Sequence, residues 1–178
     1  VMATQNPVES ESTFRLPAAQ MDRFLIRLSM GYPTAQEERE MLFSLGDAIP
    51  LDKLDTITSP EELLAAQKEI ASVQVSPAVA DYLVALVTET RIHPMVRMGA
   101  SPRASRALFR AAKVWAAMSG RDFVTPDDIQ KLAQPVLAHR LLLSNEARIS
   151  GTSAAEILSE IVSRLPVPPY AGEEFHGN

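Results

Sequence analysis

Apolar residues recur at helical spacing through the second half of the chain. In three stretches they fall three or four positions apart, which places them on one face of a helix. We expect the three apolar faces to share one buried seam, as in a helical bundle. The stripes are Val79, Tyr82, Leu83, Leu86 and Val87, then Ile129, Leu132, Ala133, Val136 and Leu137, then Ile157, Leu158, Ile161, Val162 and Leu165.

Start signals for helices precede these stripes and others. Ser or Thr can accept a hydrogen bond from the first-turn backbone, and Glu three residues later can return one, which is a capping box. Proline fits the first turn because its missing N–H has no partner there in any case. Such signals predict helices after six positions: Thr34, Ser59, Ser76, Ser101, Thr125 and Ser153.

The first 33 residues follow a different pattern. Val1–Gln5 is expected to be the end of a buried strand, Pro17 to begin a short helix reaching Arg23, and Phe24–Ser29 to form a second strand. A strand that starts at its own end, without an initiator methionine, indicates a piece of a longer protein.

These patterns divide the chain into four predicted parts. The first, 1–33, is the end of an α/β core, and the second, 34–72, is a connecting helical segment. The third, 73–168, is a helical domain, and the fourth, 169–178, is a tail. The expected fold class is therefore mainly α, a helical bundle preceded by a truncated α/β remnant.

Composition narrows the function further. The chain has 178 residues with 17 basic and 22 acidic side chains, a net charge of −5, and no cysteine. Scattered basic residues argue against nucleic acid as a main partner, and the lack of cysteine excludes disulfides and thiolate zinc sites. No run approaches the ~18 apolar residues of a membrane span. The histidines, His93, His139 and His176, stand apart from other possible ligands, so we predict no metal site. Because no segment could span a membrane, we also predict a cytoplasmic protein without membrane partners.

Asn6 is the first candidate for chemistry. It follows the predicted strand and precedes Pro7, which directs the chain out of the sheet. Ligands of open α/β sheets lie beyond the carboxyl ends of strands, where an amide can hold a water or a phosphate oxygen. The alternative is that Asn-Pro only opens a turn.

Two arginines at predicted helix ends are the other candidates. Arg23 closes the short helix, and a guanidinium at a subunit edge can stabilise phosphoryl-transfer charge in a neighbour; alternatively it binds the last carbonyls of its own helix. Arg103 is the second residue of the helix after Ser101, where the helix dipole favours an anion.

Arg103 also shares one arc of its helix with other cations, which on their own would indicate a solvated face. Arg106 fits either interpretation. The arc is Arg103, Arg106, Arg110 and Lys113, and opposite it lie Leu108, Ala111, Ala112, Trp115 and Met118. We expect Trp115 and the methionines to fill the core.

In this order and spacing, several motifs resemble the MoxR family of AAA+ ATPases over residues 1–168. Ala3-Thr-Gln-Asn6-Pro is similar to the family's sensor 1 strand end. Leu16–Phe24 is similar to its L-P-E-A-Q-L-D-R-F segment, with Ala18 where Glu is usual. Three further segments resemble family signatures: Gly31-Tyr-Pro33, Gly99–Ala104 and Gly120–Asp128.

The resemblance implies roles that the residues alone do not. It makes Asn6 the sensor 1 residue, Arg23 an arginine finger that acts in trans, and Arg103 the sensor 2 residue that contacts an ATP phosphate. The helical domain would be the AAA+ lid, and the parent protein would hydrolyse ATP with Mg²⁺.

The resemblance also implies assembly and partners. Family members form rings, commonly hexamers, and act as chaperones, often with partners that contain a von Willebrand factor A-type domain. The chain contains no G-x-x-x-x-G-K-[ST] and no Walker B segment, so we expect no ATP hydrolysis or tight cofactor binding by this chain alone. The alternative function is a non-enzymatic helical domain that binds proteins or DNA.

Overall fold

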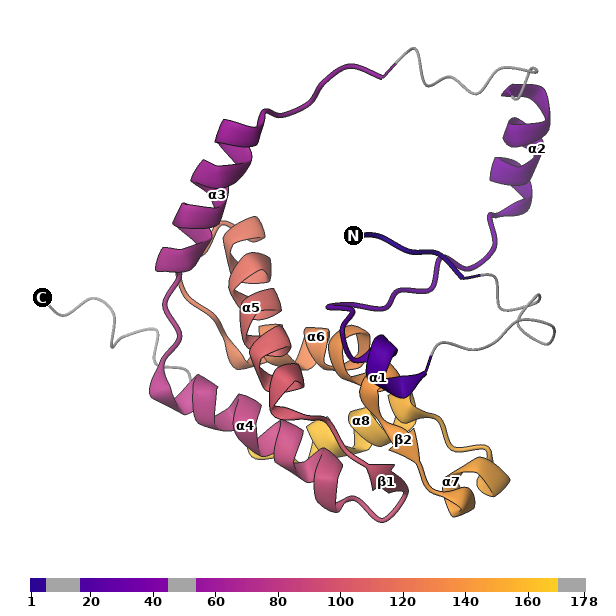
Figure 1. Ribbon diagram of the computed structural model, residues 1–178, viewed down its shortest axis with the longest axis vertical. Coiled ribbons are helices and arrows are strands. Elements are labelled where there is room, and N and C mark those ends of the chain that lie inside the picture. The colour runs from indigo at the N-terminus through magenta and orange to yellow at the C-terminus, as the bar shows by residue number, and fades with distance from the viewer. Residues whose placement is uncertain (6–16, 45–53, 170–178) are drawn as a thin grey trace, which may run out of the picture. The chain divides into compact units, whose positions relative to one another are not determined.

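The computed structural model describes residues 1–5, 17–44 and 54–169. These residues fall into two compact units, one made of Val1–Arg27 with Val73–Asn178 and the other of Leu28–Ser72. Figure 1 labels the elements. In the first unit they are α1 (Ala18–Met21), α4 (Pro77–Ile92), β1 (Val96–Met98), α5 (Pro102–Met118), α6 (Pro126–Leu137), the 3₁₀ turn η3 (Ala138–Arg140), β2 (Leu142–Leu143), α7 (Asn145–Ser150) and α8 (Ala154–Arg164).

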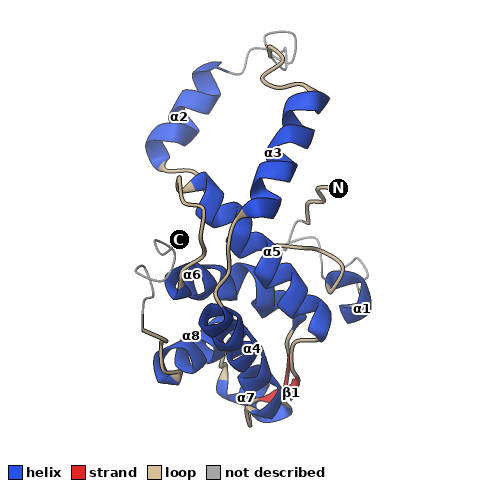
Figure 2. Ribbon diagram, turned by 90° about the vertical axis from the view of Figure 1, so that its left-hand side faces the viewer, coloured by secondary structure: helices blue, strands red, loops and turns tan. Residues whose placement is uncertain are grey.

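Helices α4, α5, α6 and α8 enclose a single hydrophobic core (Figures 1 and 2). The predicted stripes of α4 and α6 are entirely buried, and α8 buries three of its five stripe residues while the other two pack against the core. Helix α5 contributes mostly alanines, whose small side chains let neighbouring helices approach closely. Its buried residues are Ala104, Ala107, Leu108, Ala111, Ala112 and Ala116.

The helix starts follow their predicted caps. Ser76, Thr125 and Ser153 each accept a hydrogen bond from the backbone N–H of the third helical residue. In the box at Ser153, the hydrogen bond from its backbone lowers the pKa of Glu156. Among the described residues, Ser144 caps α7 in the same way, with 3.2 Å between its hydroxyl and the Ala147 nitrogen.

The second unit holds α2 (Ala35–Ser44) and α3 (Pro60–Ser72). Both begin at capping boxes: the Thr34 nitrogen lies 2.7 Å from the Glu37 carboxylate, and the Ser59 nitrogen 2.8 Å from that of Glu62. No residue of α3 is buried.

The two predicted strands near the start are wrong. Val1–Gln5 and Phe24–Ser29 have no strand structure, because a strand requires a hydrogen-bonded partner and the named strands of the described residues pair only with each other. Those strands are β1 and β2, which the pattern did not predict; they run antiparallel with Val96 opposite Leu143.

The expectation that Trp115 and the methionines fill the core is also wrong. Trp115 is 39% exposed and Met118 78% exposed. The face of α5 that packs on the core consists of alanines and Leu108, and Trp115 and Met118 lie outside that face. Met95 is the methionine that packs against the core among the described residues.

The mainly helical fold class is confirmed. The predicted boundaries at residues 33, 72 and 168 stay predictions. No helix in the described parts of the chain is long and apolar enough to cross a membrane.

Candidate functional site

The turn after α1 carries the first of the candidate arginines. The Pro17 carbonyl accepts hydrogen bonds from the Gln20 and Met21 nitrogens, and the chain then turns through Asp22 and Arg23. Arg23 is exposed. Within the described ranges, its guanidinium has no ion-pair partner. The helix is shorter than predicted, since it ends at Met21 and Arg23 lies just beyond it.

Asp22 turns the other way, toward the helical domain. Its carboxylate lies 3.6 Å from an Arg103 nitrogen and 3.8 Å from an Arg140 nitrogen. The Ser101 hydroxyl lies 3.5 Å from both carboxylate oxygens, longer than an ordinary O–H···O bond. One acidic side chain thus links the α1 turn to the start of α5 and to η3.

Phe24 anchors the far side of the same turn. Its carbonyl oxygen accepts a 2.6 Å hydrogen bond from Nη2 of Arg140, and Nε2 of His139 lies 3.1 Å from the same oxygen. Three residues later, the Arg27 nitrogen donates to the Pro135 carbonyl in α6 at 2.9 Å. The segment 22–27 is therefore fastened to the end of α6 and to η3.

Arg140 is the buried cation of this cluster, with a side chain only 2% exposed. Burial lowers the pKa of its guanidinium, the Asp22 carboxylate acts to raise that pKa, and the charge of Arg103 lowers it. The guanidinium stays protonated at any ordinary pH, so the fold keeps a full positive charge beneath the turn.

His139 lies beside it in the chain and is half-buried. Burial lowers the pKa of the imidazole; the Phe24 carbonyl acts to raise it, and the charge of Arg140 lowers it. Nε2 can donate to Phe24 in one tautomer or accept from Nε of Arg140, 3.3 Å away, in the other. A single nitrogen cannot do both at once, so each tautomer makes only one of these two hydrogen bonds.

Arg103 stands at the start of α5, and the preceding loop fixes that start. The buried Thr90 hydroxyl accepts from the Ala100 nitrogen at 3.0 Å, and Nε of Arg91 donates to the Ala100 carbonyl at 2.8 Å. Gly99 lies so close that a Cβ there would come within 2.5 Å of the Thr90 carbonyl oxygen. The loop therefore cannot shift without breaking its hydrogen bonds to the end of α4.

Ser101 departs from the prediction. The helix begins after it as expected, but its side chain makes no capping hydrogen bond; the hydroxyl faces Asp22 instead. No acidic residue lies in the first turn of α5, so the positive end of the helix and the Arg103 side chain, 59% exposed, add to each other. The same arc continues in Arg106 and Arg110, both exposed, as expected of a solvated face.

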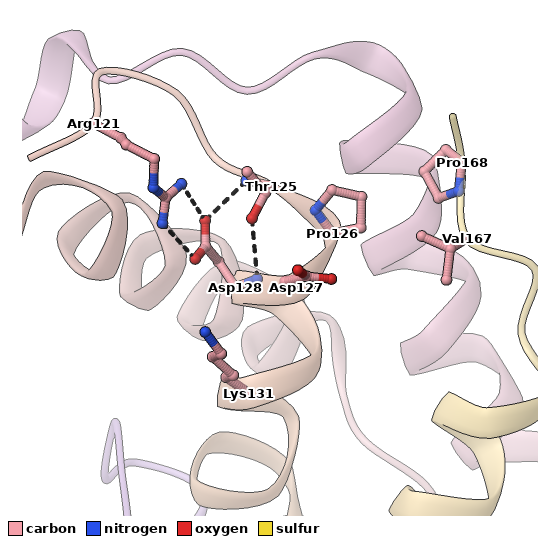
Figure 3. Close-up of a pocket in the computed structure, with 8 residues that line it drawn as sticks. All are labelled: Arg121, Thr125, Pro126, Asp127, Asp128, Lys131, Val167 and Pro168. Carbon is pink, nitrogen blue, oxygen red and sulfur yellow. Dashed lines mark hydrogen bonds and ion pairs between the residues drawn. The ribbon is translucent and has the colours of Figure 1, made fainter. Parts of the chain in front are cut away.

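A separate hollow of about 490 Å³ lies at the start of α6 (Figure 3). Figure 3 shows Arg121 and Thr125 turned toward the Asp128 carboxylate; Arg121 donates two hydrogen bonds of 2.8 and 2.7 Å, and the Thr125 nitrogen one of 2.8 Å. These partners belong to the Gly120–Asp128 motif, which therefore serves the fold. The hollow is lined by Arg121, Thr125, Pro126, Asp127, Asp128, Lys131, Val167 and Pro168.

The structure describes two of the three predicted site residues, Arg23 and Arg103, and connects them through Asp22. Arg23 adjoins Asp22, which pairs with Arg103, while Asn6 lies outside the described residues. The sequence reasoning missed Arg140 and treated His139 as isolated, because no local pattern signals a contact made across more than 110 positions. Among the described residues, no group of three His, Cys, Asp or Glu could hold a metal ion.

Two sequence-family profiles match the chain. The profile described as an AAA lid domain covers residues 88–161, and that of the ATPase family associated with various cellular activities covers residues 1–26. The first match spans α5 and η3, and the second contains the α1 turn.

Individual proteins and a solved structure are also similar to this chain. The Bacillus subtilis protein named "Uncharacterized protein YeaC" is 45% identical over 94% of this chain and 52% of its own. "Chaperone MoxR1" of Mycobacterium tuberculosis is 38% identical over 94% of this chain and 46% of its own. A crystal structure from Cytophaga hutchinsonii, designated an ATPase, has 32% identity and a TM-score of 0.84, covering 92% of this chain and 52% of that one.

The chain thus spans about half the length of these relatives. The matched profiles, the relatives named MoxR and the structural likeness agree with one another and with the motifs. The chain belongs to the MoxR type of AAA+ ATPases, of which it contains the lid and the adjoining end of the AAA module.

Proposed function

We propose that this chain supplies the phosphate-sensing arginines of a MoxR-type AAA+ ATPase. Arg23 is the arginine finger, Arg103 the sensor 2 residue and Asn6 the sensor 1 residue. The observation that carries the proposal is the Asp22 carboxylate, which adjoins Arg23 in the chain and lies 3.6 Å from Arg103. The carboxylate thus holds the residue before Arg23 beside Arg103, and among the described residues it makes no ion pair with Arg23 itself.

Arg103 suits a phosphate oxygen for physical reasons. A guanidinium presents a planar fork of donors, and the positive end of a helix adds to its attraction for anions. Both features meet at the start of α5, on a side chain that is more than half exposed. Its ion pair with Asp22 is long and partly solvated, so an incoming phosphate can displace the carboxylate at small cost.

Arg23 suits the transfer step. The backbone on both sides of it is fixed through Asp22 and Phe24, whereas its own side chain is exposed. A finger has to reach a nucleotide held by another subunit and stabilise the negative charge that builds up late in phosphoryl transfer. Because Asp22 directly precedes Arg23 and pairs with Arg103, we expect the two arginines to act on the same phosphoryl group.

The nucleotide cradle has to come from elsewhere. This chain contains no P-loop motif, and the groups that we assign to the phosphate end of a nucleotide are Arg23, Arg103 and Asn6. When bound, MgATP supplies the phosphoryl group; the residues described here orient it and balance its charge. We further propose that the longer protein is cytoplasmic, forms a ring, such as a hexamer, and remodels partner proteins as a chaperone, including partners with a von Willebrand factor A-type domain.

The test is Arg23→Ala in the full-length protein. We expect kcat for ATP hydrolysis to fall roughly 100-fold or more, with ATP affinity nearly unchanged, because the charge matters most in the transition state. Arg23→Lys should rescue poorly, since a point charge does not replace a planar fork. Arg110→Ala, which removes an exposed arginine from α5, is the matched control and should keep wild-type turnover.

Subunit mixing tests action in trans. Arg23→Ala subunits mixed with subunits that lack the P-loop lysine should regain part of the activity, because some interfaces then combine an intact P-loop with an intact finger. Wild-type turnover in Arg23→Ala would reduce Arg23 to a helix-end residue and refute the proposal.

A further inference from the structure

We infer that Arg140 is a positioning residue for Arg23: from η3 it clamps the chain on both sides of the finger and makes the finger move with the lid. This inference rests on the proposed role of Arg23. It assigns a function to a buried cation that the sequence motifs leave unexplained.

The contacts of Arg140 bracket Arg23. Nη2 donates to the carbonyl of Phe24, the residue after Arg23, at 2.6 Å, and Nη1 lies 3.8 Å from the carboxylate of Asp22, the residue before it. The hydrogen bond holds the backbone at Phe24, whereas the contact with the Asp22 side chain is an ion pair in which Nη1 makes no hydrogen bond. Arg23 itself stays exposed. This arrangement positions the backbone from which the Arg23 side chain extends, and it leaves the Arg23 guanidinium available to a ligand.

The partners of Arg140 indicate which part of the fold its side chain stabilises. Apart from the adjacent His139, its hydrogen-bond and ion-pair partners among the described residues all belong to the α1 turn. Within the part of the chain that the structure describes, its side chain makes no such contact with α4, α5, α6 or α8. Burying a guanidinium costs free energy unless the group is paired. Because the partners of Arg140 lie in the turn, its pairing stabilises the docked turn rather than the helical core.

The clamp also joins two parts of the nucleotide machinery. Arg140 and Arg103 meet the same carboxylate, at 3.8 and 3.6 Å, and η3 follows directly on α6, whose Pro135 holds the Arg27 nitrogen. A displacement of the lid therefore carries the finger with it. Through Asp22, release or capture of a phosphate at Arg103 also alters the charge that Arg140 faces.

The first experiment measures the clamp without ATPase activity, in this chain. Hydrogen exchange of the Arg27 amide, which reports docking of the segment on Pro135, should speed up roughly tenfold in Arg140→Gln, the effect of losing one charge-assisted hydrogen bond. Amides of α4 and α8 should be unaffected. Arg110→Gln is the control, and unchanged exchange of Arg27 in Arg140→Gln would overturn the inference.

The second experiment is a double-mutant cycle in the full-length protein. Arg140→Gln should lower kcat roughly tenfold at nearly constant KM for ATP. Combined with Arg23→Ala it should lower kcat no further than Arg23→Ala does alone, because a misplaced finger and a missing one are equivalent. A merely structural role would give multiplying effects.

The outcomes separate the two claims. If Arg23→Ala lowers kcat and Arg140→Gln does not, or the two effects multiply, Arg140 is not a positioning residue. If Arg23→Ala itself leaves kcat unchanged, the proposed function fails while the exchange result still judges the clamp. If Arg140→Gln does not fold, Arg140→Lys is measured by the same criteria, since it keeps the charge and loses the bridging fork.

Discussion

At the scale of single residues, two buried charged side chains, Asp128 and Arg140, differ in where their partners lie. Asp128 is 1% exposed, and all its hydrogen-bond partners come from its own loop and helix start. Burial acts to raise its pKa, but the hydrogen bonds from Arg121 and Thr125 outweigh burial and leave the pKa below its usual value. Arg140 shows the opposite use, since its partners lie in a distant turn.

We therefore expect Asp128→Ala to lower the free energy of unfolding by about 3–5 kcal/mol, because it leaves Arg121 without its buried partner. Urea denaturation of this chain measures the change. Asp127→Ala, at the exposed neighbouring position, removes only a favourable helix-dipole charge and should cost about 0.3–1 kcal/mol. Equal effects of the two substitutions would contradict the buried-pair interpretation.

The same pair sets a pH dependence. Because the folded pKa of Asp128 is lowered, its stabilisation is complete above the unfolded value of about 3.8 and is lost as pH falls through the folded pKa. The difference in stability between the wild type and Asp128→Ala should hence shrink below about pH 4.

At the scale of elements, local sequence was a good guide to helices and a poor guide to what joins them. Caps at Ser76, Thr125 and Ser153 act within one turn, so the sequence predicted where those helices begin. Strands depend on partners elsewhere, which explains the two wrong strand predictions. The Ser101 side chain makes no capping hydrogen bond and faces Asp22, 79 positions away in the sequence.

The candidate site shows the same division. The motifs singled out Arg23 and Arg103, but the residue that links them, Asp22, and the residue that clamps the turn, Arg140, act through tertiary contacts that no spacing reveals. The sequence can thus predict which residues are candidates for this site. Their mutual placement is a property of the packed helices.

The loop between α4 and α5 gives an element-level prediction. Gly99→Ala should lower the free energy of unfolding by about 1–3 kcal/mol, because the added Cβ would lie 2.5 Å from the Thr90 carbonyl oxygen and 2.6 Å from the Arg91 Cα. Denaturant titration detects the loss. Met98→Ala, one position earlier and 54% exposed, should change stability by less than about 0.5 kcal/mol; a comparable loss there would mean that close approach of the glycine is unimportant.

At the scale of the whole molecule, stability is concentrated in the helical domain. Every buried core residue among the described ones lies between Val73 and Ile161. The α1 turn adds polar contacts to this body, and α3 buries nothing of its own. We infer that the lid is the folding unit and that segment 22–27 is attached to it by polar contacts.

A polypeptide of residues 73–168 should therefore fold without the rest of the chain. It keeps the whole core and the caps of α4, α6 and α8, so local and tertiary preferences agree throughout. We expect a helical circular dichroism spectrum and a cooperative thermal transition. Leu158→Ala, at a position 1% exposed, should destabilise it by about 2–5 kcal/mol, whereas Ile149→Ala, at a position 88% exposed, should have little effect. A non-cooperative melt would show that the core needs the α1 segment, and the polar contacts of Asp22 and Phe24 would then be part of what folds the lid.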